Sequence, residues 1–429
     1  MFKTLRKIWS LRDLRKRIFL TFVLLIIIRM IALIPIPGIS NETLKEFFSG
    51  NQVLGLLDIF SGGTLSNFSI GLMGVGPYIT GSIIMQLLTY IVPSLDELNK
   101  EGESGRQKIN QYTRYLTVPL SIVQSFSLLV LLKSQGVLPA LAPLALVSIL
   151  LSSTAITMIF VWIGEIISEE GIGNGMSLII TVGILASIPN QVANTTALIA
   201  SEGEIDMVKV YGLIAFVLIA IFTVFFIVLM NDAIRKVPIS YARRMTGKLS
   251  HSTIDTFLPV KINIAGVIPI IFALSIIVFP GLAGNYLTHA RSGWLQTMGS
   301  NMVKFFNPAS LSYGIMYFLL VVLFTYFYTA IVFQPKQISE NLQKQGGFVP
   351  GIRPGIQTSN YIEMIVRRIT FPGSVFLGIV AILPLIIQSV THITTLVLGG
   401  TGILIIVSVV FETANQLKSH LVTRDYEHY

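Results

Sequence analysis

Side chains that could carry out chemistry are few in this chain of 429 residues. It contains no cysteine, so neither disulfides nor thiolate chemistry are expected. The stretch GIGNG at 171–175 is rich in glycine like a phosphate-binding loop, but it fits neither the dinucleotide nor the P-loop pattern. The five histidines lie in polar segments and lack metal-ligand spacing: His251, His289, His392, His420 and His428. The residues therefore predict a protein that is not an enzyme, with no catalytic residue, metal site, cofactor or nucleotide site.

The elements that must position any functional site are apolar helices. The chain is 53% hydrophobic and 12% charged, whereas a soluble domain usually has about a quarter of its residues charged. Because about 20 apolar residues cross a bilayer as a helix, we predict ten spans: 18–34, 75–92, 115–132, 143–163, 174–189, 210–230, 264–280, 314–333, 371–390 and 396–411. No cleavage site follows the first span, so we expect a multi-pass protein that retains it. The glycines of GIGNG then suit a helix start where backbones approach closely.

The distribution of basic residues predicts the orientation. Of the 30 Lys and Arg residues, 24 fall in the N-terminus, the C-terminal tail and the loops on that same side. Five fall on the opposite side, and Arg29 alone lies within a span. The positive-inside rule places both termini in the cytoplasm. This topology accounts for the net charge of +9 without a nucleic-acid partner.

Acidic residues, lysine and histidine are missing from the ten spans. Glu165 and Glu412 lie at span ends on the cytoplasmic side, and Arg29 could snorkel or pair with a helix end. Ion-coupled transporters usually need an acidic residue, a histidine or a lysine inside the bilayer. A proton or sodium transporter is therefore disfavoured, although sodium sites made of carbonyl oxygens stay open.

Two corresponding helix starts indicate two halves. GVGP at 74–77 opens the second span, and GVIP at 266–269 opens the seventh. Because five spans per half is an odd number, repeated halves would be inverted in the membrane. Coincidence is the alternative for so short a match. We divide the chain into a basic amphipathic N-terminus (1–17), an N-terminal half (18–190), an external hinge loop (191–209), a C-terminal half (210–411) and a cytoplasmic tail (412–429).

Two cytoplasmic loops, 231–263 and 334–370, are longer than the joining of helices requires. Their basic character favours a docking surface for a large acidic partner. Solvated loops near anionic lipid are the alternative.

Motifs along the whole chain resemble the SecY family of protein-conducting channels. They are IPIPGI (34–39), FSGGTLSNFSI (60–70), PYITGSIIMQLL (77–88), KEGESGRQKINQYTRY (100–115), GIGNGMSLII (171–180), AGVIPIIFA (265–273), FYTAIVFQP (327–335) and FVPGIRPGIQT (348–358). The resemblance implies an all-α polytopic membrane protein. Its ten transmembrane helices form two inverted five-helix halves around a central pore, with a re-entrant plug helix.

The same resemblance implies a function and partners. The chain would be a passive translocase subunit in the bacterial plasma (inner) membrane. It would conduct unfolded secretory polypeptides and release membrane-protein helices sideways. Its implied partners are the membrane subunits SecE and SecG, the SecA ATPase or a ribosome as driver, signal-sequence-bearing substrates and anionic lipids.

The resemblance also assigns a pore ring. Carried over residue by residue, the ring consists of Val75, Ile79, Met176, Ile180, Ile271 and Ile405. The family usually has isoleucine at these positions, so Val75 and Met176 depart from it; methionine is the more flexible side chain. An apolar constriction resists ions because it can dewet. For any one of these residues alone, an ordinary place in the core is the alternative.

The poor helix former at 58–79 is then explained as a plug and its hinge. Irregular backbone at membrane depth is tolerated only where protein buries it or a watery cavity adjoins it. We predict a short re-entrant plug made of Ile59, Phe60, Ser61, Gly62, Gly63, Thr64, Leu65, Ser66, Asn67, Phe68, Ser69 and Ile70. Gly71, Gly74 and Gly76 would form its hinge, and Pro77 would lie in the first turn of the true span.

Two further sites follow from the resemblance. The lateral gate between the second and seventh spans would include Thr80, Gln86, Ser275 and Phe279. Its polar contacts would hold it only weakly, and polar pairs unrelated to gating are the alternative. The motor or ribosome would dock on Arg353, held between Gly351 and Pro354 so that its guanidinium can capture a carboxylate. Arg243, Arg244 and Lys248 would lie beside it, with plain solvated charge as the alternative.

Two functions are consistent with the sequence. A passive polypeptide channel powered by a partner requires that the chain have no nucleotide site of its own. A secondary transporter for an uncharged or weakly charged solute merely permits that absence.

Overall fold

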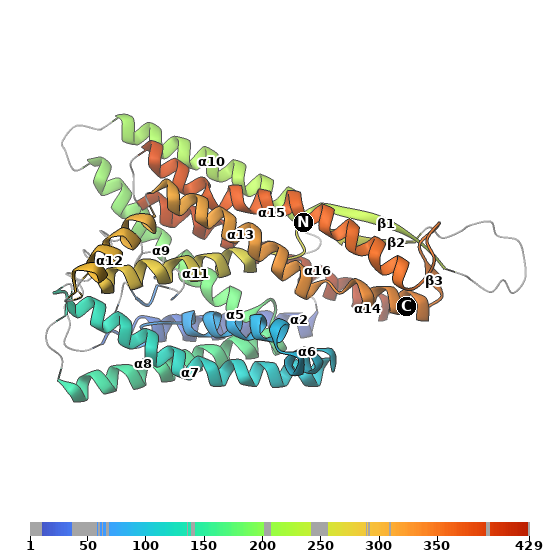
Figure 1. Cartoon of the computed structure of the whole chain (residues 1–429), viewed down its shortest axis with the longest axis horizontal. Helices are drawn as coiled ribbons and strands as arrows, with labels where there is room; N and C mark the ends of the chain where they lie inside the picture. Colours follow the sequence, from blue (N-terminus) through green and yellow to red (C-terminus); the bar gives the residue numbers. More distant parts are fainter. Residues whose placement is uncertain are drawn as a thin grey trace, which may run out of the picture.

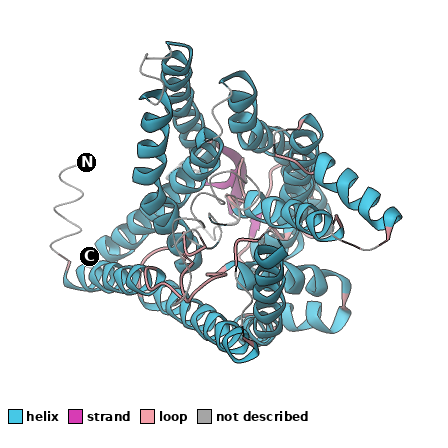
Figure 2. Ribbon diagram, turned by 90° about the vertical axis from the view of Figure 1, so that its left-hand side faces the viewer, coloured by secondary structure: helices cyan, strands magenta, loops and turns pink. Residues whose placement is uncertain are grey.

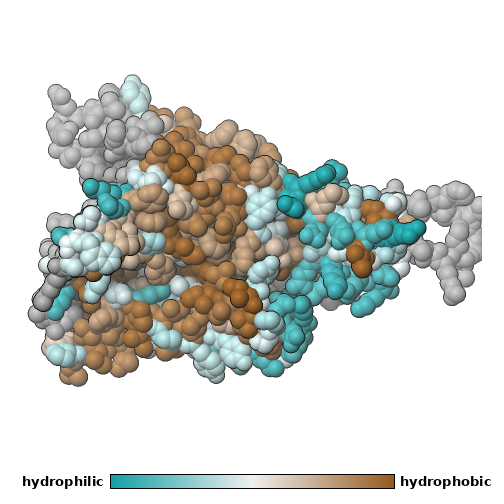
Figure 3. All heavy atoms as spheres, viewed as in Figure 1, coloured by the Kyte–Doolittle hydropathy of each residue, from teal (hydrophilic) through white to brown (hydrophobic). Residues whose placement is uncertain are grey.

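Long helices that run roughly parallel to one another make up most of the computed structural model (Figure 1). It describes residues 11–36, 58, 61, 63–65, 68–134, 136–138, 142–200, 207–241, 256–288, 290, 292–308, 310–391 and 395–427. Seen along the long axis, the helices surround a central region (Figure 2). Apolar residues form a broad band across the middle of the visible face, and hydrophilic residues gather at the end that carries α14 (Figure 3).

Each predicted span overlaps one long helix. These are α2 (Arg12–Ala32), α5 (Gly76–Ile91), α7 (Glu103–Ser134), α8 (Pro143–Glu170), α9 (Gly175–Ala200), α10 (Met207–Asp232), α11 (Ile268–Leu287), α13 (Leu311–Val332), α15 (Ile356–Thr391) and α16 (Thr395–Glu427). Three shorter helices are α6 (Pro93–Lys100), α12 (Gly293–Phe305) and α14 (Pro335–Lys344). A helix suits lipid because all of its backbone groups bond within the segment.

Six helices within the described residues are long and apolar enough to cross a membrane: α7, α8, α10, α11, α13 and α15. The bent pair α5 and α6, which turns by 99°, would make a seventh. The chain is therefore a multi-pass membrane protein. The count of ten spans stays a prediction.

A small sheet occupies the two long polar loops, where the sequence predicts no strand. Strand β1 (Ile234–Tyr241) pairs antiparallel with β2 (Thr256–Lys261) and with β3 (Gly347–Phe348), in the order β2-β1-β3. The inward side chains of the sheet form an apolar cluster with α14 and α15: Val237, Ile239, Val260, Leu342, Ile362 and Val366. The two loops are therefore one structural unit. Hydropathy misses it because each strand buries only alternate side chains.

The main apolar core joins both halves of the chain. It contains buried side chains from α2, α5, α8, α9, α10, α11, α13, α15 and α16. A second cluster joins residues 65–72 to α7 and α8. Residues 65–72 of the second cluster lead directly into Val75 and Ile79 of the main core, and the site is built at this start of α5.

Candidate functional site

All six predicted ring residues lie in or against the main apolar core. Their helices are α5, α9, α11 and α16, with Val75 as the N-cap of α5, so both halves contribute. Five are buried and Met176 is half-buried: Val75, Ile79, Met176, Ile180, Ile271 and Ile405. Val75 and Ile79 are four residues apart, and so are Met176 and Ile180. This spacing places both side chains of each pair on one face of a helix. The structure therefore brings the predicted ring into one apolar region.

Glycines fix how closely α8 and α9 cross. A Cβ at Gly175 would lie 1.9 Å from the carbonyl oxygen of Gly164, so only glycine fits there. A Cβ at Gly164 would in turn lie 2.7 Å from Cε of Met176. The expectation that GIGNG allows close approach is confirmed. The end of the Met176 side chain therefore packs against Gly164 of α8. This contact could not be predicted from the position of Met176 in the sequence.

The core also contains residues that were not predicted from the sequence. Ile184 lies one turn beyond Ile180 and is 2% exposed. A Cβ at Gly402 of α16 would lie 2.5 Å from Cγ2 of Ile184. Helices α9 and α16 therefore cross closely at this pair. The spacing of four residues from Ile180 is the signal that could have identified Ile184.

The plug segment at 59–70 is described in part. Five of its residues lie outside the described residues: Ile59, Phe60, Gly62, Ser66 and Asn67. From Gly63 onward, the described ones form turns and bends rather than a continuous helix. Leu65 and Phe68 are fully buried in the second cluster, with Leu128 and Leu132 of α7. This part of the segment is therefore seated firmly against α7.

Backbone contacts tie the end of the plug segment to the residues after α2. Pro35 and Ser69 form an isolated antiparallel bridge. The N–H of Ile70 donates to the carbonyl oxygen of Ile34 at 3.0 Å. Residues 34–36, the first half of the motif IPIPGI, therefore contribute directly to seating the plug segment.

The start of the plug segment is organised by Asp58. Its carboxylate Oδ1 accepts hydrogen bonds from the N–H of Leu65 at 3.1 Å and from Ser61 Oγ at 3.4 Å. Its carbonyl oxygen accepts from the N–H of Gly63 at 2.8 Å. Asp58 was not predicted as a site residue, although an aspartate before a short turn is a common cap.

The three predicted hinge glycines differ. Gly74 has φ +51°, and a Cβ there would lie 2.2 Å from the carbonyl oxygen of Ser61. A Cβ at Gly71 would lie 2.8 Å from Cγ2 of Ile156, whereas nothing lies within 4 Å at Gly76. The first turn of α5 contains Pro77, as predicted. Gly74 is therefore the position where the plug segment and α5 meet most closely.

A cavity of about 650 Å³ lies between the plug segment, α5, α7 and α11. It contains three of the four predicted gate residues, and Gln86 does not line it. Its lining is mostly apolar: Ser61, Leu65, Met73, Gly76, Thr80, Val123, Gln124, Phe126, Ser127, Leu128, Val130, Leu131, Ser275, Val278, Phe279, Ala283, Tyr286 and Leu287. The cavity could therefore hold an apolar segment.

The polar gate residues bond within their own half rather than across the gate. Gln124 Nε2 of α7 donates to Thr80 Oγ1 at 3.3 Å, and Gln86 Nε2 donates to Ser82 Oγ at 3.1 Å. Among the described residues, no hydrogen bond joins Thr80 or Gln86 to Ser275 of α11. The expected polar link across the gate is therefore absent from this part of the chain, because Thr80 already bonds to α7. Gln124 was not predicted as a site residue. Its polar side chain within the predicted span 115–132 could have identified it as a partner for another helix.

Helices α7 and α8 are joined by further polar contacts. The hydroxyls of Ser125 and Ser153 lie 3.0 Å apart, and Arg114 Nε lies 2.8 Å from Glu165 Oε1. With the bond between Gln124 and Thr80, these contacts join α5, α7 and α8. The three helices can therefore move as one unit relative to α11.

The predicted docking arginine lies in a turn of fixed shape. Arg353 is exposed, and its carbonyl oxygen accepts a hydrogen bond from Thr358 Oγ1 at 2.9 Å. The neighbouring Gly351 and Gly355 have φ +81° and +99°, which favour glycine. In the described part of the chain, the guanidinium has no ionic partner. The other predicted basic residues lie outside the described residues: Arg243, Arg244 and Lys248.

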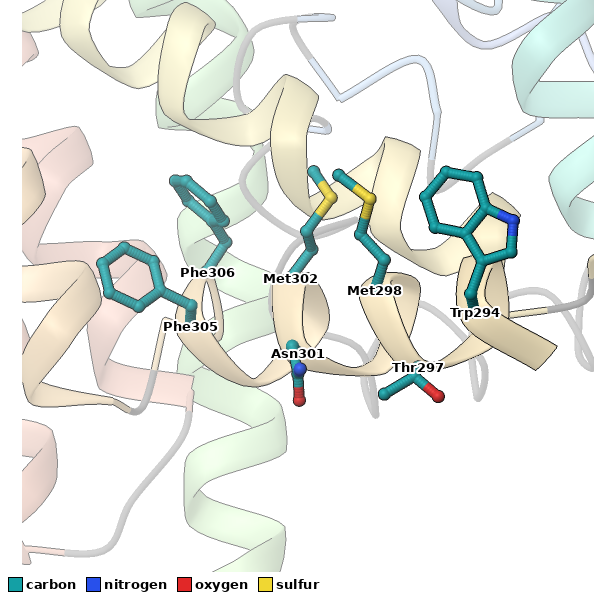
Figure 4. Close-up of a pocket in the computed structure, with 7 residues that line it drawn as sticks. All are labelled: Trp294, Thr297, Met298, Asn301, Met302, Phe305 and Phe306. Carbon is teal, nitrogen blue, oxygen red and sulfur yellow. The ribbon is translucent and has the colours of Figure 1, made fainter.

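A second cavity, of about 710 Å³, lies along α12 and contains none of the predicted site residues. Trp294, Met298 and Met302 point to one side of the helix, and Thr297 and Asn301 point to another (Figure 4). No ionisable side chain lines this cavity. Its lining therefore provides mostly apolar surface and no acid, base or charged side chain.

Comparisons with known proteins agree on one family. The family model described as SecY matches residues 69–414. The protein translocase subunit SecY of Halalkalibacterium halodurans is 40% identical over 438 residues, covering 100% of this chain and 99% of the relative. The same subunit of Streptomyces galbus is 38% identical over 433 residues, covering 97% of this chain and 96% of the relative.

Solved structures share the fold. A structure of a protein-conducting channel has a TM-score of 0.63 at 18% identity, covering 94% of this chain and 91% of that one. A structure reported for the plug domain of the SecY protein, described as stabilising the closed state and maintaining a membrane seal, has a TM-score of 0.66 at 18% identity and the same coverage. Sec61 in a canine ribosome-channel complex has a TM-score of 0.59 at 18% identity, again with the same coverage.

Proposed function

The chain belongs to the SecY family, and we propose that the region around the start of α5 is the closed pore of a protein-conducting channel. Members of this family are protein translocase subunits and not enzymes, and this chain is one of them. The finer assignments concern which residues form the ring, the plug, the gate and the docking surface. The gathering of six apolar ring residues from four helices of both halves carries the proposal.

An apolar ring suits a channel for polypeptides of any sequence. It provides no replacement for the hydration shell of an ion, so it opposes ion flow when narrow. It also presents no hydrogen-bonding side chain that would hold a sliding chain. Val75, Ile79, Ile180, Ile271 and Ile405 are aliphatic and buried, which supports this role.

The segment 59–70 is proposed to close the pore as a plug. Its described residues are held by local hydrogen bonds, by the bridge to Pro35 and by burial of Leu65 and Phe68. All of these contacts can be exchanged without breaking a transmembrane helix. In the solved SecY structure mentioned above, the plug domain is described as stabilising the closed state of that channel.

Sideways release is proposed to occur between α5 and α11. The cavity there is mostly apolar, and the described hydrogen bonds of Thr80 and Gln86 lie within the N-terminal half. A signal helix that enters the cavity would then displace apolar contacts and no hydrogen bond across the gate. We place Thr80, Ser275 and Phe279 at this gate, and Gln86 farther along α5, outside the lining of the cavity.

Docking of the driver is proposed at the end that carries the sheet. Arg353 lies shortly after β3, and the loop with Arg243, Arg244 and Lys248 follows β1. The solved relatives include channels in ribosome complexes, which supports a ribosome as one driver. We propose SecA as the other, with SecE and SecG as membrane partners and anionic lipids near the basic N-terminus. The plasma membrane, with both termini cytoplasmic, is the proposed location.

Cross-linking of a moving substrate tests the pore. The natural chain has no cysteine, so single cysteines at positions 79, 180 and 271 can each be joined to a stalled, signal-sequence-bearing polypeptide. A cysteine at position 221 is the control, because Ile221 of α10 is 63% exposed on the outer face of the bundle. We expect cross-links at the three pore positions only. Cross-links at 221 alone, or saturable uptake of a small solute without any partner, would contradict the channel.

A further inference from the structure

Arg29 is the single charged residue inside the predicted spans, and it lies near the end of α2. A charged side chain in a bilayer is expensive unless it is paired, and it usually marks a functional site. The site described above leaves Arg29 without a role. From the sequence we expect only that it snorkels or pairs with a helix end.

The guanidinium of Arg29 reaches the plug segment. Its Nη1 lies 3.8 Å from the position that a Cβ would take at Gly63. The carbonyl oxygen of Gly183 in α9 lies at the same distance from that point. The Arg29 guanidinium therefore lies where α2, α9 and the plug segment come together. A Cβ at Gly63 would be in ordinary contact with both groups, and it is the φ of +78° that favours glycine there.

The charge opposite Arg29 is carried by Asp58. The carbonyl oxygen of Asp58 accepts a hydrogen bond at 2.8 Å from the N–H of Gly63, the residue that the Arg29 guanidinium reaches. Asp58 therefore lies in the turn next to Arg29, where its negative charge favours the charged guanidinium. The same carboxylate caps the plug segment through the N–H of Leu65 at 3.1 Å and Ser61 Oγ at 3.4 Å. One aspartate thus lies near the cation of α2 and caps the segment that is proposed to move.

We infer that Arg29 and Asp58 form a charge latch that holds the plug closed. This inference rests on the proposed plug function. When the plug leaves its seat, Asp58 moves away from α2 and Arg29 is left as an uncompensated charge in the membrane. Such a charge is costly, so the closed state is favoured. Arg29 acts through Asp58 and is therefore a positioning residue, and the driver must overcome the latch at each opening.

Neutral variants separate the charge from the cap. Asp58→Asn keeps a side-chain oxygen that can cap the plug segment but removes the negative charge, and Arg29→Gln removes the positive charge. Each variant is reconstituted as the full chain with its membrane subunits in vesicles, and the release of trapped potassium is measured without a driver. Removal of either charge leaves the other without its counter-charge at the plug seat, so we expect potassium release to rise about tenfold or more in either variant.

The double variant Arg29→Gln/Asp58→Asn tests the coupling. If the two residues form one latch, the double variant leaks about as much as either single variant. If they act independently, the two increases multiply to about a hundredfold, and the latch is refuted. Arg29→Lys keeps the charge and should restore most of the seal, which a purely steric role would not require.

Controls separate the latch from the plug itself. Asp96→Asn breaks the exposed ion pair with Lys100 and should leave release unchanged. Replacement of residues 59–70 by a short glycine-serine linker should raise release. If that replacement leaks while Arg29→Gln and Asp58→Asn stay sealed, the plug stands and the latch is wrong. If the replacement stays sealed, the plug function itself fails. The amount of channel inserted in the vesicles is measured by its protection from added protease. Potassium release is then divided by that amount, so that variants are compared per inserted molecule.

Discussion

Substitution of Gly74 by alanine is expected to unseat the plug. Gly74 has φ +51°, a conformation that costs an ordinary L-residue about 1–2 kcal/mol. The added Cβ would also lie 2.2 Å from the carbonyl oxygen of Ser61, well inside a normal contact of about 3.5 Å. That oxygen belongs to the backbone, so rotation of a side chain cannot relieve the contact. Either Ser61 and its plug segment move away, or the start of α5 changes shape.

The conformational strain alone sets the minimum effect. A shift of about 1–2 kcal/mol changes the ratio of two states by about 5- to 30-fold, so potassium release from vesicles should rise by at least about fivefold in Gly74→Ala. The matched control is Gly76→Ala, because no atom lies within 4 Å of its added Cβ and alanine favours a helix. The control should remain sealed. Equal leak in both variants, or a tight seal in Gly74→Ala, would refute the assignment of Gly74 as the point of contact.

Four other substitutions test the ring, the docking surface and the N-terminal half. Ile79→Asn and Ile180→Asn should each raise the resting conductance several-fold, because a polar group holds water in an apolar constriction; unchanged conductance in planar bilayers would remove them from the ring. Arg353→Glu should stop substrate translocation while leaving insertion normal, and normal translocation into vesicles would remove Arg353 from the docking surface. Arg114→Leu should lower the free energy of unfolding by about 1–3 kcal/mol, because it strips Glu165 of its partner at 2.8 Å, and an unchanged thermal transition would contradict this.

The polar contacts of α7 constrain how the gate can open. Because Gln124 bonds to Thr80 and Ser125 contacts Ser153, α7 is joined to both α5 and α8. Hydrogen bonds within a membrane contribute only about 0.6 kcal/mol each on average, but several of them act together here. Opening should therefore separate α5 and α7 together from α11 rather than split α5 from α7.

The helices and the start of α5 followed from the sequence. Hydropathy over about 20 residues is a local property, so each predicted span overlaps one helix. The roles of Gly74 and Pro77 could also be predicted, because they depend on local backbone geometry. Glycine tolerates a positive φ, which Gly74 has, and proline suits the first turn of a helix, where Pro77 lies.

Only the tertiary structure decided which groups meet. The sheet depends on β3, which lies far along the chain from β1 with several helices between them, so no local pattern predicts it. Thr80 bonds to α7 rather than to α11, and the Arg29 guanidinium of α2 lies next to Gly63, whose N–H donates to Asp58. The sequence identifies polar and charged residues in a membrane protein. Their partners depend on how the helices cross, because a buried polar group takes whichever partner the packing brings within reach.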